Sequence, residues 1–241
     1  MITLIGLDGD DTLWHSESYF AMTEGALAEL LAPYADGNDL RSRMLDTERR
    51  NLRLFGYGVK GFTLSMIETA IDLSDGRIPA AEIRAIIDHG KALLDHPIDL
   101  LDGVDEVVDE LAPNHRLVII TKGDLFHQES KVAVSGLAER VFGVEIVAEK
   151  DEATYRRILD RYDTAPDEFL MIGNSVRSDV LPGLEVGGAA VHVPYHVTWE
   201  LEVVDPPEVH HDRFWVLDSI RALPSLVREL REGSVAGAQS G

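Results

Sequence analysis

Short apolar runs alternate along the chain with segments whose apolar residues recur every three or four positions. The runs lie at 2–7, 117–120, 169–172 and 189–193, with a weaker one at 144–148. Each has the length of a strand and is followed by turn or polar residues. Strands that alternate with helices indicate parallel βαβ units, and unbroken apolar strands suit a sheet covered on both faces. The pattern predicts an α/β fold with a doubly wound parallel sheet.

Two segments between these runs have clear helical spacing. Apolar or aromatic residues recur at i, i+3, i+4 and i+7 in Val104, Val107, Val108 and Leu111, and again in Tyr155, Ile158, Leu159 and Tyr162. This spacing places all four residues on one face of a helix. We therefore expect one helix before the 117–120 strand and one before the 169–172 strand.

A long interruption separates the first apolar run from the second. Only helical patterns occur between residues 16 and 97, and glycines at 56, 58 and 61 predict a loop among them. The helical stripes are Leu27, Leu30 and Leu31; Leu64, Ile67 and Ile71; and Ile83, Ile86 and Ile87, beside a polar helical segment at 39–54. We predict an all-helical domain at 16–97, inserted into an α/β core of residues 1–15 and 98–231. The small, polar residues at 232–241 predict a disordered tail.

Composition narrows the classes of partner. The 241 residues include 22 Lys and Arg against 43 Asp and Glu, a net charge of −21. Because such a chain repels phosphate backbones, neither nucleic acid nor a membrane surface is an expected partner. The lack of cysteine excludes a disulfide framework, and neither a signal peptide nor a membrane span is expected. We expect a cytoplasmic monomer or homodimer.

The first apolar run ends in Asp8-Gly9-Asp10-Asp11-Thr12. Ligands of open α/β sheets bind beyond the carboxyl ends of the strands, so Asp8 and Asp10 would face the binding crevice. Such an acidic cluster repels itself unless a cation lies among the acids, and Mg²⁺ suits a site that also binds phosphate. Taken alone, the segment is equally consistent with an acidic turn.

Three later segments place further polar residues at predicted strand ends. Thr121 and Lys122 follow the second run, and Asn174 and Asp179 follow the fourth, while Lys150 precedes a helix. A hydroxyl, backbone N–H groups and a lysine suit the oxygens of a phosphoryl group. Individually, each segment also fits a plainer role as a turn, a solvated lysine or a helix N-terminal acid. The combination favours one site, because all of these residues would meet at one edge of the sheet.

In order and context, these segments resemble the four motifs of the haloacid dehalogenase-like superfamily. Asp8–Thr12 is similar to the first motif, Thr121 to the second, Lys150 to the third, and Gly173-Asn174 with Asp179 to the fourth. The helical insertion resembles the cap of the α-helical (C1-type) cap subclass. The resemblance covers about residues 1–195, and the first and fourth motifs are its most specific parts.

The resemblance implies a magnesium-dependent phosphatase acting on a small phosphate monoester, such as a nucleotide or a sugar phosphate. Asp8 would attack phosphorus, and Asp10 would act first as acid and then as base. Thr121 and Lys150 would hold the phosphoryl oxygens, with Thr121 and Lys122 contacting the substrate. The ligands of Mg²⁺ would be Asp8, the main-chain carbonyl of Asp10, Asp179 and Asn174.

Asp10 favours a phosphate ester, because dehalogenases of this superfamily lack an acid at that position. In two places the chain departs from the common pattern. Asn174 stands where many members have aspartate, which removes a charge from the metal site, and Gly9 replaces a bulkier apolar residue.

The predicted loop at 55–62 is the candidate for substrate recognition by the cap, through Tyr57 and Lys60. Its aromatic residues would equally well fill the core of the cap. Three alternatives to a phosphatase remain. A phosphomutase or a phosphonatase could use the same scaffold, the latter needing an imine-forming cap lysine, Lys60 or Lys91. A non-catalytic phospho-acceptor would resemble bacterial receiver domains, although these are shorter and have no helical insertion.

Overall fold

The computed structural model describes residues 1–204 and 211–238, which form two compact units. The sheet unit consists of Met1–His15, Ile98–Lys122 and Glu129 onward. The helical unit consists of Ser16–Pro97 and Gly123–Gln128. The chain passes between units at 15/16 and 97/98, and residues 123–128 also belong to the helical unit.

The sheet unit is built on six parallel strands in the order β3-β2-β1-β4-β5-β6. The strands are β1 (Leu4–Leu7), β2 (Arg116–Lys122), β3 (Gly143–Val147), β4 (Phe169–Gly173), β5 (Ala189–His192) and β6 (Phe214–Val216). The prediction of a parallel α/β sheet is confirmed, and β6 is an addition to it. β1 lies at the centre, paired with β2 and β4.

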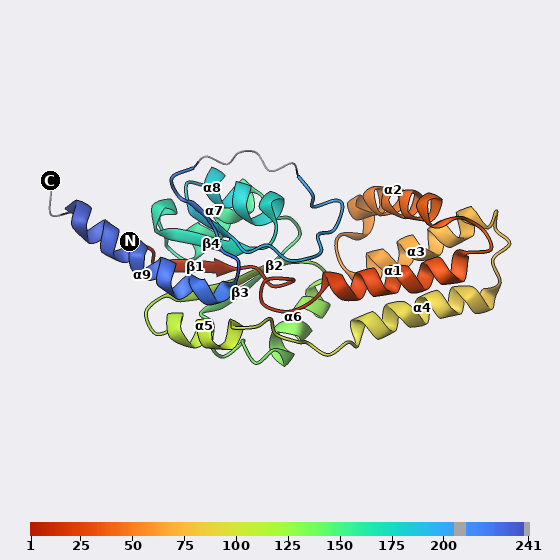
Figure 1. Cartoon of the computed structure of the whole chain (residues 1–241), viewed down its shortest axis with the longest axis horizontal. Coiled ribbons are helices and arrows are strands. Elements are labelled where there is room, and N and C mark those ends of the chain that lie inside the picture. Colours follow the sequence, from red (N-terminus) through yellow and green to blue (C-terminus); the bar gives the residue numbers. More distant parts are fainter. Residues whose placement is uncertain (205–210, 239–241) are drawn as a thin grey trace. The chain divides into compact units, whose positions relative to one another are not determined.

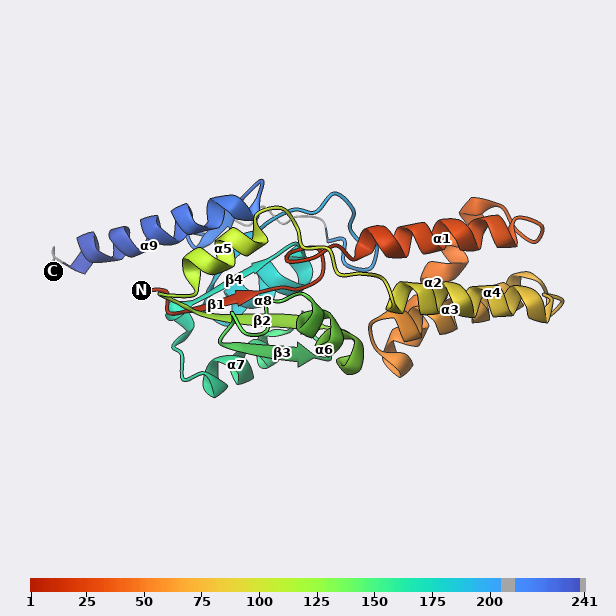
Figure 2. The ribbon, with the colours of Figure 1, turned by 90° about the horizontal axis from the view of Figure 1, so that it is seen from below.

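Helices cover both faces of this sheet, as Figures 1 and 2 show. On one face, α5 (Val104–Leu111), α9 (Leu223–Ala238) and Val132 pack against alternate strand residues such as Ile5, Leu7, Leu117 and Ile119. On the other face, α7 (Glu152–Arg161) and Val186, which directly follows α8 (Leu181–Glu185), share an apolar cluster with the intervening residues Leu4, Val118 and Ile120. Because successive residues of a strand point to opposite faces, a sheet covered twice needs an apolar residue at every position. This explains the unbroken apolar runs in the sequence.

The spacing found at Val104, Val107, Val108 and Leu111 is the buried face of α5. Gly103 adopts φ 88° immediately before this helix, a backbone conformation that a side chain would strain. The second predicted stripe forms the buried face of α7 in the same way, with Tyr155, Ile158 and Leu159 buried.

The helical unit contains α1 (Glu17–Leu31), α2 (Gly37–Phe55), α3 (Val59–Leu73) and α4 (Ala80–Leu94), which follow β1 in the chain. They share an apolar core that includes Leu27, Leu31, Met66 and Ile86. An all-helical insertion between β1 and β2 is therefore confirmed. α2 is held at its start by the side chain of Asp36, which accepts hydrogen bonds from two backbone N–H groups of the first turn.

The predicted loop at 55–62 is shorter than expected. Only residues 56–58 lie between α2 and α3, while Gly61 and Phe62 belong to α3, and Phe62 is buried in the core of the helical unit. Gly56 and Gly58 have φ of 70° and 111°, so these two glycines make the turn. An added Cβ on Gly61 would lie 2.9 Å from the carbonyl oxygen of Gly56, so this glycine permits close packing inside a helix.

The last helix, α9, continues to Ala238, beyond the predicted end of the core domain at residue 231. Of the predicted tail at 232–241, residues 239–241 lie outside the described residues. No helix within the described parts of the chain combines the length and the apolarity that a membrane crossing requires.

Candidate active site at the carboxyl ends of the strands

The register of the sheet brings the ends of its central strands to one edge. Leu7, the last residue of β1, lies beside Ile119 of β2 and Ile172 of β4, and Asp8 N–H then donates to the carbonyl of Ile172 at 2.9 Å. Asp8 and Thr121 therefore emerge on the same edge, where ligands of parallel sheets bind.

Asp8, Lys150 and Asp179 form a buried group of charges at this edge. Lys150 Nζ donates to Asp8 Oδ1 and, at 2.7 Å, to Asp179 Oδ1. All three residues are buried, with only 2% of the Lys150 side chain exposed. Motifs one, three and four of the predicted set thus meet through direct contacts.

Burial and neighbouring charges shift the pKa values of Asp8 and Lys150. The pKa of Asp8 is raised to about 7, because burial and the charge of Asp179 together outweigh the lowering effect of Lys150. Burial disfavours the charge of Lys150 as well, but the carboxylates of Asp179 and Asp8 outweigh it and raise the pKa of this lysine. The site therefore keeps an ammonium and an excess of negative charge in a space with little water.

Thr12 connects the first motif to the fourth. Its hydroxyl lies 3.2 Å from Asp8 Oδ2, to which it donates, and accepts a hydrogen bond of 3.0 Å from the N–H of Asn174. The Asn174 side-chain oxygen is 3.5 Å from the same hydroxyl. Asn174 therefore lies beside Asp8, where the sequence placed it.

Asp179 is fixed by the turn that follows β4. Its Oδ2 accepts a hydrogen bond of 3.0 Å from the N–H of Ser175, and it belongs to a π-helical segment, Val176–Val180. An added Cβ on Gly173 would lie 2.0 Å from Asp179 Oδ2. The glycine at the end of β4 is thus required because the carboxylate occupies the place of a side chain.

Asp10 has two donors of its own. Trp14 Nε1 lies 2.6 Å and Lys131 Nζ 2.7 Å from Asp10 Oδ1. Lys131 comes from α6 (Leu125–Val134), a helix that the sequence analysis did not single out. Asp8 and Asp10 therefore contact different lysines.

Lys122, predicted to contact substrate, has a different environment. Its Nζ donates to Glu202 Oε1 at 2.6 Å and to Ser178 Oγ at 2.7 Å. Glu202 Oε2 in turn accepts from the hydroxyls of Ser175 and Ser178, both at 2.6 Å. Lys122 thus joins a network that supports the turn after β4.

Tyr57 and Lys60, the predicted recognition residues, belong to the helical unit. Lys60 Nζ donates to both carboxylate oxygens of Asp124, at 3.0 and 2.9 Å, and Tyr57 is half-buried at the turn between α2 and α3. The hydrogen bond from Lys60 holds the pKa of the Asp124 carboxyl below its usual value. Lys60 does meet an anion, and this anion is a side chain of its own unit.

The donor set suits a hard divalent cation. Asp8 and Asp179 supply two carboxylates that share a single ammonium, and burial together with the charge of Asp179 raises the pKa of Asp8. Mg²⁺ typically takes one or two carboxylates and keeps several waters, so a neutral Asn174 is compatible with it. No group of three or more His, Asp or Glu side chains arranged for a metal occurs among the described residues. A cation here would depend on the two carboxylates together with main-chain and amide oxygens.

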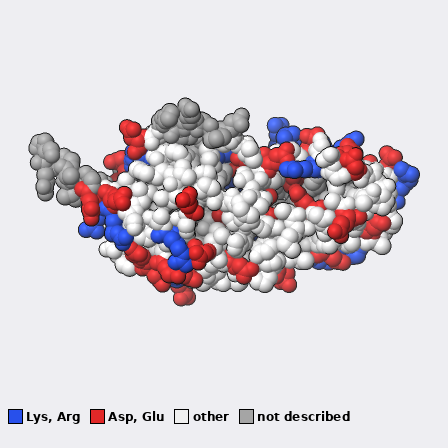
Figure 3. All heavy atoms as spheres, viewed as in Figure 1, with Lys and Arg blue, Asp and Glu red and all other residues white. Residues whose placement is uncertain are grey.

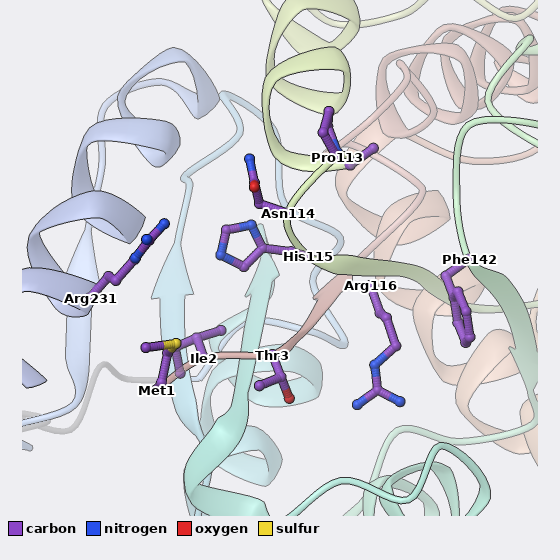
Figure 4. Close-up of a pocket in the computed structure, with 10 residues that line it drawn as sticks. Met1, Ile2, Thr3, Pro113, Asn114, His115, Arg116, Phe142 and Arg231 are labelled. Carbon is purple, nitrogen blue, oxygen red and sulfur yellow. The ribbon is translucent and has the colours of Figure 1, made fainter.

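A hollow lies at the opposite end of the same strands. Its volume is about 460 Å³, and its lining includes residues before β1 and at the start of β2. Figure 4 shows Thr3, His115 and Arg116 among them. The Arg116 guanidinium makes intramolecular hydrogen bonds. It donates to the Tyr162 carbonyl at 2.6 Å and to Thr164 Oγ1 at 2.9 Å. None of the predicted site residues lines this hollow.

Several residues of the site were not anticipated from the sequence. Lys131 and Glu202 have no local signal, since each is a single charged residue outside the four motifs. For Trp14 the sequence did contain a signal, which is the unusually small residue at position 9. An added Cβ on Gly9 would lie 2.7 Å from Trp14 Cζ2 and 3.1 Å from Thr121 Oγ1, so the indole fills the space of a side chain at residue 9.

The sequence and the fold are similar to those of known hydrolases. The family model of haloacid dehalogenase-like hydrolases matches residues 2–187. No protein of curated function matches the chain. A haloacid dehalogenase-like family hydrolase from Xanthomonas campestris is similar over 99% of this chain and 94% of its own, with 43% identity and a TM-score of 0.87.

Two more distant structures share the fold. A magnesium-bound HAD hydrolase from Bacillus subtilis is 15% identical with a TM-score of 0.64, and covers 93% of this chain and 98% of its own. An L-2-haloacid dehalogenase from Xanthobacter autotrophicus, with chloropropionic acid covalently bound, is 18% identical with a TM-score of 0.62, and covers 95% of this chain and 99% of its own. With its parallel sheet, its helical insertion after β1 and its match over most of the sequence, the chain belongs to the haloacid dehalogenase-like hydrolases.

Proposed function

We propose that this hydrolase is a magnesium-dependent phosphatase that cleaves a small phosphate monoester through an aspartyl-phosphate at Asp8. The observation that carries the proposal is the acid at residue 10, held by Lys131 and Trp14 beside the nucleophile strand. Cleavage of an ester has to protonate a leaving alkoxide, whereas release of a halide ion does not. A fixed second acid is therefore expected in a phosphatase and is unnecessary in a dehalogenase.

The residues of the site divide the chemistry between two steps. In the first, an Asp8 oxygen forms a bond to phosphorus, the bond to the ester oxygen breaks, and that oxygen takes a proton from Asp10. In the second, Asp10 accepts a proton from water, whose oxygen bonds to phosphorus while the bond to Asp8 breaks. Inorganic phosphate leaves, and Asp8 is again a carboxylate.

Lys150 and Thr121 would neutralise and position the phosphoryl oxygens. Lys150 already lies against Asp8 with its ammonium buried, where a charge acts more strongly than in water. The buried Thr121 follows Ile120 on the strand beside β1. Both therefore lie at the edge of the sheet to which the phosphoryl group would bind.

Magnesium would be held by the carboxylates of Asp8 and Asp179, the main-chain carbonyl of Asp10 and the amide oxygen of Asn174. Bound there, it would offset the repulsion between an anionic nucleophile and an anionic substrate. The residues that compete for these carboxylates are Lys150 and Thr12, which contact them in the structure.

The three alternatives to a phosphatase that the sequence left open have less support. A phosphonatase requires an amine free to form an imine, whereas Lys60 donates to Asp124 and Lys91 donates to Asp88 at 3.2 Å. A phosphomutase would use the same core residues, and its signature is the return of phosphate to the substrate. A non-catalytic phospho-acceptor is not supported, because the family model that matches this chain describes hydrolases.

The test is release of inorganic phosphate from a panel of phosphate monoesters, with and without Mg²⁺, beside release of chloride from 2-chloropropionate. We expect phosphate release that requires Mg²⁺, no chloride release, and a loss of about 10⁴-fold or more in kcat for Asp8→Asn. Chloride release by the wild type, or equal phosphate release by Asp8→Asn, would contradict the proposal. Consumption of an ester without free phosphate would indicate a mutase.

A further inference from the structure

One oxygen of the Asp10 carboxylate accepts hydrogen bonds from two buried side chains. Trp14 Nε1 and Lys131 Nζ both reach Oδ1, at 2.6 and 2.7 Å. The Trp14 side chain is completely buried, and 8% of the Lys131 side chain is exposed, against 30% for Asp10. The donors are therefore enclosed in the protein, while the acid that they hold reaches the surface of the site.

The indole is held rigidly by the turn that contains the first motif. Trp14 O accepts a hydrogen bond of 2.7 Å from the N–H of Asp11, whose φ of 63° closes the turn. The N–H of Leu13 donates to the carbonyl of Gly9 at 2.8 Å. Since the ring also fills the space where a Gly9 side chain would stand, Trp14 has little freedom to move away from Asp10.

Lys131 approaches Asp10 from a separate part of the chain, on α6. A largely buried ammonium needs a carboxylate partner, because an unpaired charge is costly to remove from water. The ion pair thus fixes the side chain of Lys131, and with it the direction of Asp10. Lys150 lies instead between Asp8 and Asp179, so the two lysines serve different carboxylates.

From this geometry, and resting on the proposed phosphatase function, we propose that Trp14 and Lys131 are positioning residues for the proton transfer by Asp10. A carboxylate oxygen that accepts two N–H hydrogen bonds has both of its lone pairs engaged. The proton given to the leaving alkoxide, and later taken from water, therefore belongs on Oδ2. Trp14 and Lys131 would fix where that oxygen points without touching the substrate.

A positioning role makes a prediction about the leaving group. An alkyl ester needs a proton on its departing oxygen in the first step, whereas p-nitrophenolate leaves without one, so only the alkyl ester depends on Asp10 for transfer of its phosphoryl group to Asp8. The value of kcat/KM covers the steps up to release of the alcohol and excludes the later attack of water, which is common to both esters. Trp14→Phe, which keeps an aromatic ring but removes the N–H, and Lys131→Met should lower kcat/KM on an alkyl phosphate by about 10- to 100-fold. On p-nitrophenyl phosphate, the same variants should lose less than about 3-fold in kcat/KM.

Two further variants separate positioning from folding. Lys131→Arg keeps a donor for Asp10 and should recover part of the loss on the alkyl ester. Arg156→Met removes an exposed cation of α7 that pairs with Glu152, and should leave both esters unaffected. Circular dichroism and urea unfolding would establish that each variant compared is folded.

The outcomes distinguish this proposal from the proposed function. If the wild type hydrolyses both esters and the Trp14 and Lys131 variants lose equally on both, these residues are merely structural and the positioning proposal is overturned while the phosphatase function stands. A wild type that hydrolyses no ester overturns both. A loss confined to the alkyl ester, with partial recovery in Lys131→Arg, supports the positioning role.

Discussion

Charges are paired in opposite ways at the sheet edge and in the helical unit. At the edge, the side chains of Lys150 and Lys131 are 2% and 8% exposed and contact carboxylates from distant parts of the chain. In the helical unit, Arg49 and Lys91 are 58% and 62% exposed and pair with an acid three residues earlier. Figure 3 shows acidic and basic side chains intermixed on the surface. An exposed pair can exchange its partner for water, whereas a buried charge cannot, so only the buried pairs are expected to bear on function.

The largest effect should come from Lys150, the cation shared by Asp8 and Asp179. Lys150→Met leaves two buried carboxylates without an ammonium, so we expect a loss of about 3–5 kcal/mol in the free energy of unfolding. Phosphate release should fall by about 10³-fold. Urea unfolding with and without Mg²⁺ tests whether the loss comes from repulsion between the two carboxylates. If it does, Mg²⁺ should raise the free energy of unfolding more in Lys150→Met than in the wild type. If Lys150→Met unfolded at the same midpoint urea concentration as the wild type, the predicted loss of stability would be contradicted.

Gly9→Ala should have the next largest effect. The new methyl group would meet the rigid ring of Trp14 at 2.7 Å, so we expect a loss of about 1–3 kcal/mol in the free energy of unfolding. The double variant Gly9→Ala/Trp14→Ala should be no less stable than Trp14→Ala alone, because the clash is gone. Urea unfolding of the four proteins gives the coupling, and purely additive losses would show that the two residues do not compete for space.

Glu202→Gln should cost about 1–2 kcal/mol at neutral pH, because it removes a charge that accepts from Lys122 and two serines. Burial alone would raise the pKa of Glu202, but Lys122 and the serine hydroxyls outweigh it and lower the pKa below the usual 4.5. The charged Glu202 therefore stabilises the fold fully above pH 4.5, its usual pKa. This stabilisation is lost as the pH falls through the lower pKa that Glu202 has in the folded protein. Thermal unfolding should show the difference between wild type and variant shrinking in acid, and a constant difference would contradict this origin.

The smallest effect is expected for the exposed pair of Arg49 and Asp46. Arg49→Ala should change the free energy of unfolding by less than about 0.5 kcal/mol, because the pair is surrounded by water and screened by salt. The measurement is urea unfolding at low and high ionic strength. A loss as large as that for Glu202→Gln would remove the distinction drawn between the two regions.

The sequence predicted those features that repeat or that follow the order of the chain. The parallel sheet and the helical insertion were read from periodicity, and the meeting of Asp8, Lys150 and Asp179 followed from their places at strand ends. Contacts that depend on a single side chain had no such signal. Glu202 reaches Lys122 across 80 positions, and Lys131 reaches Asp10 across 121.

Lys122 has contacts that its local sequence does not reveal. A lysine directly after Thr121 fits a phosphate site by its chemistry, yet its carboxylate partner comes from a segment with no recognisable motif. Gly9 shows the reverse case, in which the sequence contained a clue. A residue smaller than expected implies that something else occupies its space, and in the folded chain this is the Trp14 ring.

The central position of β1 affects how the protein is made. This strand precedes both of its neighbours in the chain, which begin only at Arg116 and Phe169, after the whole of α1–α4 has been synthesised. Until β2 has been synthesised, the nascent chain therefore has an apolar strand with both edges unpaired, a state prone to aggregation. The inserted helices have an apolar core of their own and can form early, so the slow step of biogenesis is expected to be the late pairing of β1 with both neighbours.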